Sequence, residues 1–204
     1  MKKEVVIFDF DGVIVDSLDF SFEINKSHSP KLTRKEWEDM HLGNFYDAFK
    51  KHKISTVDDF YKEYESKIHH VFPIESMDKV IQSLHKKYRL TIVSGSPARI
   101  IDKYLNRYGL RDYFEAIVGN EYHLNKVEKF NKIKDLCNVS FGDCLQITDT
   151  VCDVKEGHLT GIESIAVTWG IFAKDVFKGE KTFAVVDAPE EITGAVDKFF
   201  GKGY

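Results

Sequence analysis

The sequence predicts an α/β fold, in which a doubly wound parallel sheet has a helical insertion after its first strand. Six short segments are apolar and rich in β-branched residues, as the buried strands of parallel sheets are. Helix-like stretches separate the later segments, and this alternation is typical of βαβ units. Residues 19–84 interrupt it, because they contain no convincing strand.

The elements of the expected sheet can be placed from residue 5 to residue 200. The strands are expected at 5–8, 90–93, 116–118, 144–148, 164–168 and 183–186, and the helices at 97–108, 126–136, 151–160 and 189–200. Pro97 and Pro189 stand where a first helical turn begins. Gly109, Gly161 and Gly201 stand where helices end. Strands and helices therefore alternate from residue 90 to residue 168, and a last strand and a last helix follow.

The interrupting region has aromatic and charged residues at helical spacing, as in 37–40 and 60–64. There are no internal repeats and no low-complexity linkers. We therefore expect a core domain formed by residues 1–18 and 85–204, and a helical cap formed by residues 19–84.

Composition excludes several classes of protein. Of the 204 residues 43% are hydrophobic, enough for a sizeable core, and the net charge of −4 with scattered Lys and Arg argues against nucleic-acid binding. Three cysteines without CxxC spacing support neither a zinc site nor a disulfide framework. Asp9 and Asp11 break the first apolar run too early for a secretion signal, and no run reaches membrane-spanning length. We expect a cytoplasmic protein with no membrane partner, as a monomer or weak dimer.

The most informative residues are Asp9 and Asp11, which follow the first expected strand and precede Gly12. With the period of a strand, the two carboxylates share one face. They repel each other unless a cation or a shared proton relieves them, and this arrangement suits a divalent metal beside a carboxylate nucleophile. Asp and Gly also favour turns and helix caps, so these residues alone leave both interpretations open.

Polar residues also follow later strands, where ligands of open α/β sheets bind. Ser94 and Gly95 begin a turn that can offer a hydroxyl and N–H groups to a phosphate, although Ser-Gly-Ser is also a common loop. Asp149 ends the fourth strand, and Asp153 lies in the first turn of the next helix. Both face the same crevice, although helix capping alone also explains Asp153.

The order of these motifs resembles the haloacid dehalogenase-like (HAD) hydrolase superfamily, in its phosphoglycolate phosphatase and β-phosphoglucomutase branch. The resemblance extends over the whole chain and implies a Rossmann-like core with a mobile helical cap. The matching segments, in order, are FDFDGVIVDS, IVSGS, LNKVEKF, QITDTVCDVKEG and AVTWG.

The resemblance implies a role for each polar residue. Asp9 would be the nucleophile that forms an aspartyl-phosphate, and Asp11 would be the general acid and base. Mg²⁺ would be held by Asp9, the Asp11 backbone carbonyl and Asp149. Asp153 would orient a metal-bound water or the lysine.

The phosphate would be bound by Ser94, Gly95 and Lys126 in this scheme. Lys129 is the alternative to Lys126, because the family often has Lys-Pro where this chain has Lys126-Val127. A surface lysine is the ordinary interpretation of either residue without context. A second departure is Thr148, where relatives usually have Gly, and we expect it to alter only the local shape.

The cap would close over the site and select the leaving group. Its candidate contacts are Arg34, His41, Asn44, Tyr46 and Lys50, although packing within the cap explains each of them singly. Trp169 either shapes the rim of the site or packs in the core.

The leading prediction is a Mg²⁺-dependent phosphatase that acts on a small phosphorylated metabolite. A phosphomutase of the β-phosphoglucomutase type and a catalytically silent binding protein remain the alternatives. The retained carboxylate pair disfavours dehalogenation, because dehalogenases of this fold lack the second acid.

Overall fold

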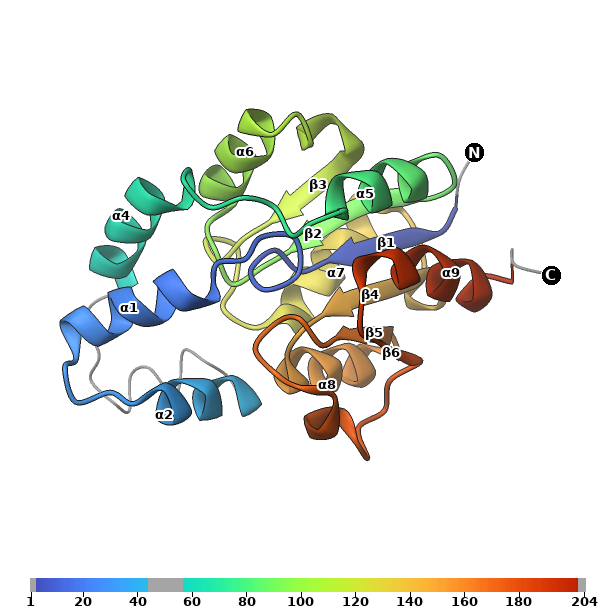
Figure 1. The fold of residues 1–204 in the computed structure, drawn as a ribbon. Coiled ribbons are helices and arrows are strands. Elements are labelled where there is room, and N and C mark those ends of the chain that lie inside the picture. Colours follow the sequence, from blue (N-terminus) through green and yellow to red (C-terminus); the bar gives the residue numbers. More distant parts are fainter. Residues whose placement is uncertain (1–2, 44–56, 202–204) are drawn as a thin grey trace.

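The computed structural model describes residues 3–43 and 57–201. A six-stranded parallel sheet with the order β3-β2-β1-β4-β5-β6 forms its centre (Figure 1). The strands are β1 (Val5–Phe8), β2 (Arg89–Val93), β3 (Phe114–Val118), β4 (Cys144–Thr148), β5 (Glu163–Val167) and β6 (Ala184–Val186). The predicted α/β fold class is confirmed.

Helices cover both faces of the sheet, and the central strand β1 is apolar on both of its sides. On β1, Val6 and Phe8 belong to one hydrophobic cluster, whereas Val5 and Ile7 belong to another. The first cluster includes residues of α5 (Met77–His85), α6 (Ala98–Arg107) and α9 (Pro189–Phe199). Helices α7 (Lys126–Cys137) and α8 (Val151–Thr160) cover the other face.

The strand and helix ends follow local chemistry. Pro97 is the N-cap of α6, so that helix starts one residue later than expected. Gly161 ends α8 with φ +83°, a left-handed conformation that glycine adopts without steric cost. Three short 3₁₀ helices lie in the connections: η2 (Arg111–Tyr113), η3 (Phe141–Asp143) and η4 (Lys174–Phe177).

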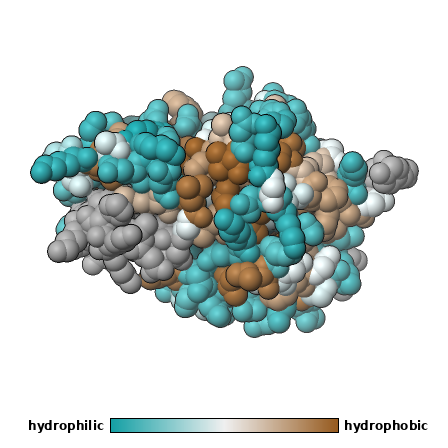
Figure 2. All heavy atoms as spheres, turned by 90° about the horizontal axis from the view of Figure 1, so that it is seen from below, coloured by the Kyte–Doolittle hydropathy of each residue, from teal (hydrophilic) through white to brown (hydrophobic). Residues whose placement is uncertain are grey.

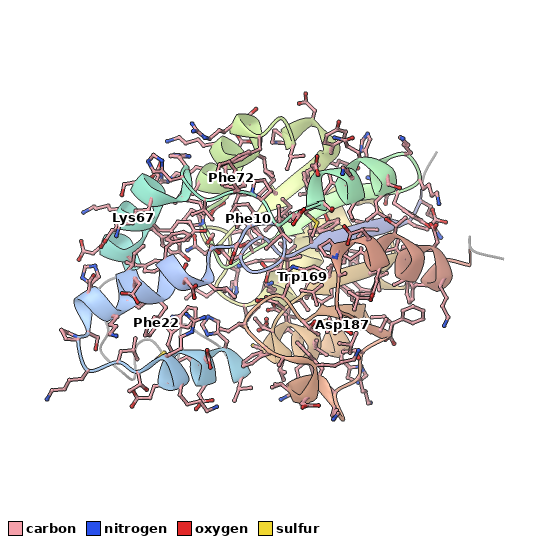
Figure 3. The ribbon with its side chains drawn as sticks, viewed as in Figure 1. Phe10, Phe22, Lys67, Phe72, Trp169 and Asp187 are labelled. Carbon is pink, nitrogen blue, oxygen red and sulfur yellow. The ribbon has the colours of Figure 1, made fainter. Side chains whose placement is uncertain are left out.

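The insertion lies at one end of the molecule, on the left in Figure 1. Its described elements are α1 (Leu18–His28), α2 (Arg34–Asp39), the 3₁₀ helix η1 (Met40–Leu42) and α4 (Val57–Ile68). A capping box between Thr33 and Glu36 starts α2. Phe22 lies between α1 and α2 (Figure 3), where its ring meets that of Trp37 at 5.7 Å.

Helix α5 belongs to a different layer from the other helices of the 19–84 range. It packs on β2 and α9, and Val80, Ile81 and Leu84 lie in the main hydrophobic cluster. We therefore place the second boundary of the proposed cap before α5, close to residue 76. The division into core and cap stays a proposal.

The surface carries both hydrophobic and hydrophilic side chains (Figure 2). Figure 2 shows a face on which hydrophobic residues gather in the middle and hydrophilic residues surround them. Within residues 3–43 and 57–201, no helix is long and apolar enough to span a membrane.

Candidate active site

The predicted site residues meet at the carboxyl ends of β1, β2 and β4, beneath the insertion. A cavity of about 160 Å³ lies there, between the core and the helices of the insertion. Its lining includes all seven residues that the sequence motifs select: Asp9, Asp11, Ser94, Gly95, Lys126, Asp149 and Asp153. Strands β2, β1 and β4 are neighbours in the sheet, so their ends bring together residues far apart in sequence.

A tight turn after β1 presents both carboxylates. The Phe10 carbonyl accepts hydrogen bonds from the N–H groups of Ile14, at 2.9 Å, and Val15, at 3.1 Å. Gly12 makes this turn with φ +70°. The same glycine lies close to Asp149, since a Cβ there would be 2.2 Å from the Asp149 Oδ2 atom. The DxDG pattern is therefore both a turn and part of a site.

Lys126 joins two of the carboxylates. Its Nζ lies 2.6 Å from Asp9 Oδ2 and 2.7 Å from Asp153 Oδ2, and all three side chains are nearly buried. Burial acts to lower the pKa of Lys126, but the charges of Asp153 and Asp9 outweigh it and raise that pKa. Burial also acts to raise the pKa of Asp153, and the Lys126 charge reverses that effect. The lysine is therefore a fixed cation beside Asp9.

Burial raises the pKa of Asp9 despite the nearby Lys126 charge. Burial likewise raises the pKa of Asp149 to about 7, although its Oδ2 accepts a hydrogen bond from the Ile171 N–H at 2.9 Å. Asp9, Asp149 and Asp153 thus share one buried region, in which Lys126 is the only closely paired cation among residues 3–43 and 57–201. An additional cation would relieve this excess of negative charge.

These residues fit Mg²⁺, which prefers oxygen ligands and usually binds through one or two protein carboxylates. The predicted ligands are the carboxylates of Asp9 and Asp149 and the backbone carbonyl of Asp11. In the part of the chain that the structure describes, no three His, Cys, Asp or Glu side chains form a metal cluster.

Three hydroxyl groups converge on Asp11. Ser17 Oγ donates to its Oδ1 at 2.5 Å, and the Tyr64 hydroxyl donates to the same oxygen. Ser96 Oγ donates to Oδ2 at 2.6 Å. Burial and the Asp11 charge raise the pKa of Tyr64, so its hydroxyl stays protonated. Both oxygens of Asp11 are therefore held in place.

The structure distinguishes the two candidate lysines. Lys126 contacts Asp9 directly, whereas the Nζ of Lys129 donates to the backbone carbonyl of Ser94. Lys129 is fully buried and also lines the cavity. Burial, together with the Lys126 charge, lowers the pKa of Lys129 to about 8. Lys126 has the geometry expected of the charge-neutralising residue, and Lys129 supports the Ser94 turn.

The candidate cap residues divide into three groups. His41 lines the cavity, and burial lowers its pKa to about 4, so the ring is neutral near pH 7. Arg34 is not among the lining residues, and its guanidinium pairs with Asp19 and Glu38. The remaining candidates, Asn44, Tyr46 and Lys50, lie outside the described residues.

Trp169 packs against the main hydrophobic cluster, and its indole N–H donates to the Val13 carbonyl at 3.4 Å. It is not a lining residue of the cavity.

Sequence reasoning missed several residues of the site. Thr148, expected only to alter the shape, donates from Oγ1 to Asp153 Oδ2 at 2.6 Å. Ser17 and Ser96 both contact Asp11, and their place inside the quoted motifs was the available signal. Tyr64 has no such signal, because it lies 53 residues from Asp11 in an aromatic stretch typical of helix packing.

Comparison with known proteins identifies the class. The sequence profile of the haloacid dehalogenase-like hydrolases matches residues 6–167, so the chain belongs to this family. A pyrophosphatase, PpaX, from Bacillus mycoides is 21% identical over a 215-residue alignment, and this alignment covers 98% of this chain and 100% of that protein. A phosphoglycolate phosphatase from Vibrio vulnificus is 21% identical over 195 residues, covering 82% of this chain and 84% of the relative.

A solved structure has the same fold. The haloacid dehalogenase-like hydrolase SP0104 from Streptococcus pneumoniae superposes with a TM-score of 0.81 at 18% identity. The match covers 95% of this chain and 98% of that chain. The predictions of family, fold class and enzyme class are confirmed.

Proposed function

We propose that the protein is a Mg²⁺-dependent phosphatase that hydrolyses a small phosphate monoester through an aspartyl-phosphate on Asp9. The ion pair between Lys126 Nζ and Asp9 Oδ2, at 2.6 Å inside the cavity, is the observation that supports it best. A cation in this position balances the charge of a carboxylate and of an incoming phosphate, which lets two anions approach each other.

The residues then divide the chemistry between them. An oxygen of Asp9 forms a bond to phosphorus, and the ester P–O bond breaks with its electron pair moving to the leaving oxygen. Asp11 supplies a proton to that oxygen, and afterwards accepts a proton from the water that cleaves the aspartyl-phosphate. Ser94 and the neighbouring backbone N–H groups bind the phosphoryl oxygens, while Lys126 neutralises their charge.

Mg²⁺, when bound by Asp9, Asp149 and the Asp11 carbonyl, supplies positive charge that shields the nucleophile from the anionic substrate. Asp153 acts through Lys126: it accepts hydrogen bonds from Lys126 Nζ, which also contacts Asp9, and from the Thr148 hydroxyl. These contacts keep the lysine pointed at the nucleophile.

The size of the cavity supports a small substrate. An apolar cavity of roughly 150 Å³ admits benzene, so about 160 Å³ has room for a phosphate and a few further atoms. Relatives named as a pyrophosphatase and a phosphoglycolate phosphatase also point to a small phosphorylated compound.

The test is release of inorganic phosphate from p-nitrophenyl phosphate in the presence of Mg²⁺. Asp9→Asn removes the nucleophile and lowers the rate by roughly 10³-fold or more, because binding does not compensate for its loss. Asp187→Asn is the control, since Asp187 is exposed and lies away from the insertion (Figure 3). Unchanged turnover in Asp9→Asn would contradict the proposal, and transfer of phosphate within a phosphorylated sugar would indicate a mutase.

A further inference from the structure

Helix α4 of the insertion reaches two separate parts of the catalytic centre with two tyrosines. Tyr61 and Tyr64 are three residues apart and therefore lie on the same side of the helix. The Tyr64 hydroxyl donates to Asp11 Oδ1, and the Tyr61 hydroxyl donates to the Gly95 carbonyl at 2.7 Å. One element of the insertion thus contacts both the expected acid–base residue and the expected phosphate-binding turn.

The two contacts belong to one connected network. The Ser96 N–H donates to Ser94 Oγ at 3.0 Å, and this N–H belongs to the same planar peptide group as the Gly95 carbonyl. Tyr61 therefore holds one side of a peptide group whose other side is held by Ser94. Ser96 Oγ then links the turn to Asp11, at 2.6 Å from Oδ2.

The tyrosine hydroxyls cannot easily move away from these partners. Tyr64 is 1% exposed, and its ring packs against Phe20 of α1 at 5.0 Å and Phe60 at 5.6 Å. The Tyr61 ring lies 5.9 Å from that of Tyr64. Because Tyr64 belongs to the main hydrophobic cluster together with Phe8 and Phe10 of the core, its position is fixed relative to the β1 turn.

We infer that Tyr64 is a positioning residue for the acid–base Asp11, and that Tyr61 positions the Ser94–Gly95–Ser96 turn for the phosphoryl group. The insertion therefore contributes to the chemical step itself, in addition to enclosing the substrate. This inference rests on the proposed phosphatase function.

Tyr64 suits this role in both protonation states of its partner. A hydroxyl donates to a carboxylate oxygen and also to the carbonyl oxygen of a carboxylic acid, so Tyr64 keeps its contact with Oδ1 when Asp11 carries its proton on Oδ2. With Ser96 on one oxygen and Tyr64 on the other, the plane of the carboxyl group is set. As the P–O bond breaks, the proton of Asp11 is then already directed at the leaving oxygen.

If Tyr64 positions Asp11, loss of its hydroxyl affects substrates with different leaving groups unequally, whereas loss of a merely structural contact does not. A basic leaving group needs the proton of Asp11 more than an acidic one does, because it leaves poorly as an anion. Loss of the Tyr64 hydroxyl therefore harms phenyl phosphate hydrolysis more than p-nitrophenyl phosphate hydrolysis. A general loss of folded protein lowers both rates by the same factor.

The experiment measures kcat/KM of Tyr64→Phe with both aryl phosphates at saturating Mg²⁺. We expect a decrease of about 10- to 100-fold with phenyl phosphate and of less than about 3-fold with p-nitrophenyl phosphate. The ratio of the two values is taken from one protein sample, so it does not depend on the fraction that is folded. Tyr88→Phe is the matched control, because it removes a buried tyrosine hydroxyl that donates to Asp197 at 2.7 Å.

Tyr61→Phe gives the complementary result. It weakens inhibition by inorganic phosphate by about 3- to 10-fold, because the turn is less well held, and leaves the ratio of the two substrates as in the parent. Equal losses on both substrates in Tyr64→Phe, with an active parent, would overturn the inference and leave the phosphatase proposal standing. A parent that releases no phosphate from either ester would overturn both.

Discussion

Gly170 gives the most direct test of the proposed metal site, because its backbone lies so close to Asp149 that there is no room for a side chain. It lies in the loop after β5, and a Cβ at this position would be 2.2 Å from Asp149 Cβ and 2.4 Å from Oδ2. The next residue, Ile171, donates its N–H to the same Oδ2. Gly170→Ala therefore forces one of the expected magnesium ligands to move while it leaves every polar group of the site in place.

The size of the effect follows from these distances. Ordinary contact begins near 3.4 Å, so the Asp149 side chain or the loop must shift by about 1 Å. A displacement of that size at a reacting centre costs about 10²-fold in rate. Overpacking of a buried position also costs about 1–3 kcal/mol of stability, which leaves an ordinary domain folded.

The assay is a Mg²⁺ titration of phosphate release at a fixed concentration of p-nitrophenyl phosphate. We expect Gly170→Ala to need a higher Mg²⁺ concentration for half-maximal rate and to have a lower maximum. Gly194→Ala is the control: this glycine lies in α9, and a Cβ there has open space within 4 Å. A Gly170→Ala protein that is folded and has the Mg²⁺ dependence of the parent would refute the placement of Asp149 in the metal site.

Two further predictions concern buried polar groups. Lys129→Met should remove a pH dependence of stability. The folded-state pKa of Lys129 lies near 8, below its ordinary value of 10.5, so the unfolded chain binds more protons between these two pH values. The parent protein therefore gains stability as the pH rises through this range. Urea unfolding at pH 7 and pH 10 should show the parent gaining roughly 2–3 kcal/mol relative to the variant, and equal pH responses would contradict the assignment. Thr148→Val should cost about 1.5–3 kcal/mol of folding stability and lower turnover about tenfold, because Asp153 loses its hydrogen bond from the Thr148 hydroxyl. Thr160→Val is the control, since it removes a hydroxyl on the surface of a helix. Matching losses in the two variants would argue against a role for Thr148.

Local patterns in the sequence predicted most of the sheet and the catalytic side of the site. Strand β4 has the predicted bounds, and the β-branched residues of β1 alternate between two clusters as a buried parallel strand requires. The ends of β1, β2 and β4 were predicted to converge because parallel strands present their carboxyl ends at one edge. Asp9, Ser94 and Asp149 could therefore be brought together before any tertiary contact was known.

The insertion was less predictable, since helical periodicity shows which face of a helix is apolar and does not show what that face contacts. Arg34 was a candidate for the substrate, but it pairs with Asp19 and Glu38 within the insertion. Helix α5 has a helical pattern similar to that of α4, yet it packs on the sheet beside α9.

The sequence by itself determined the α/β fold, the family and the four aspartates that line the cavity, because each depends on residues within one motif or at the end of one strand. Tertiary packing decided how those groups are held: Lys126 between Asp9 and Asp153, Lys129 on the Ser94 carbonyl, and Tyr64 on Asp11. The physical reason is that a hydrogen bond across 53 residues depends on how buried surfaces fit together, and single-sequence periodicity does not encode that fit.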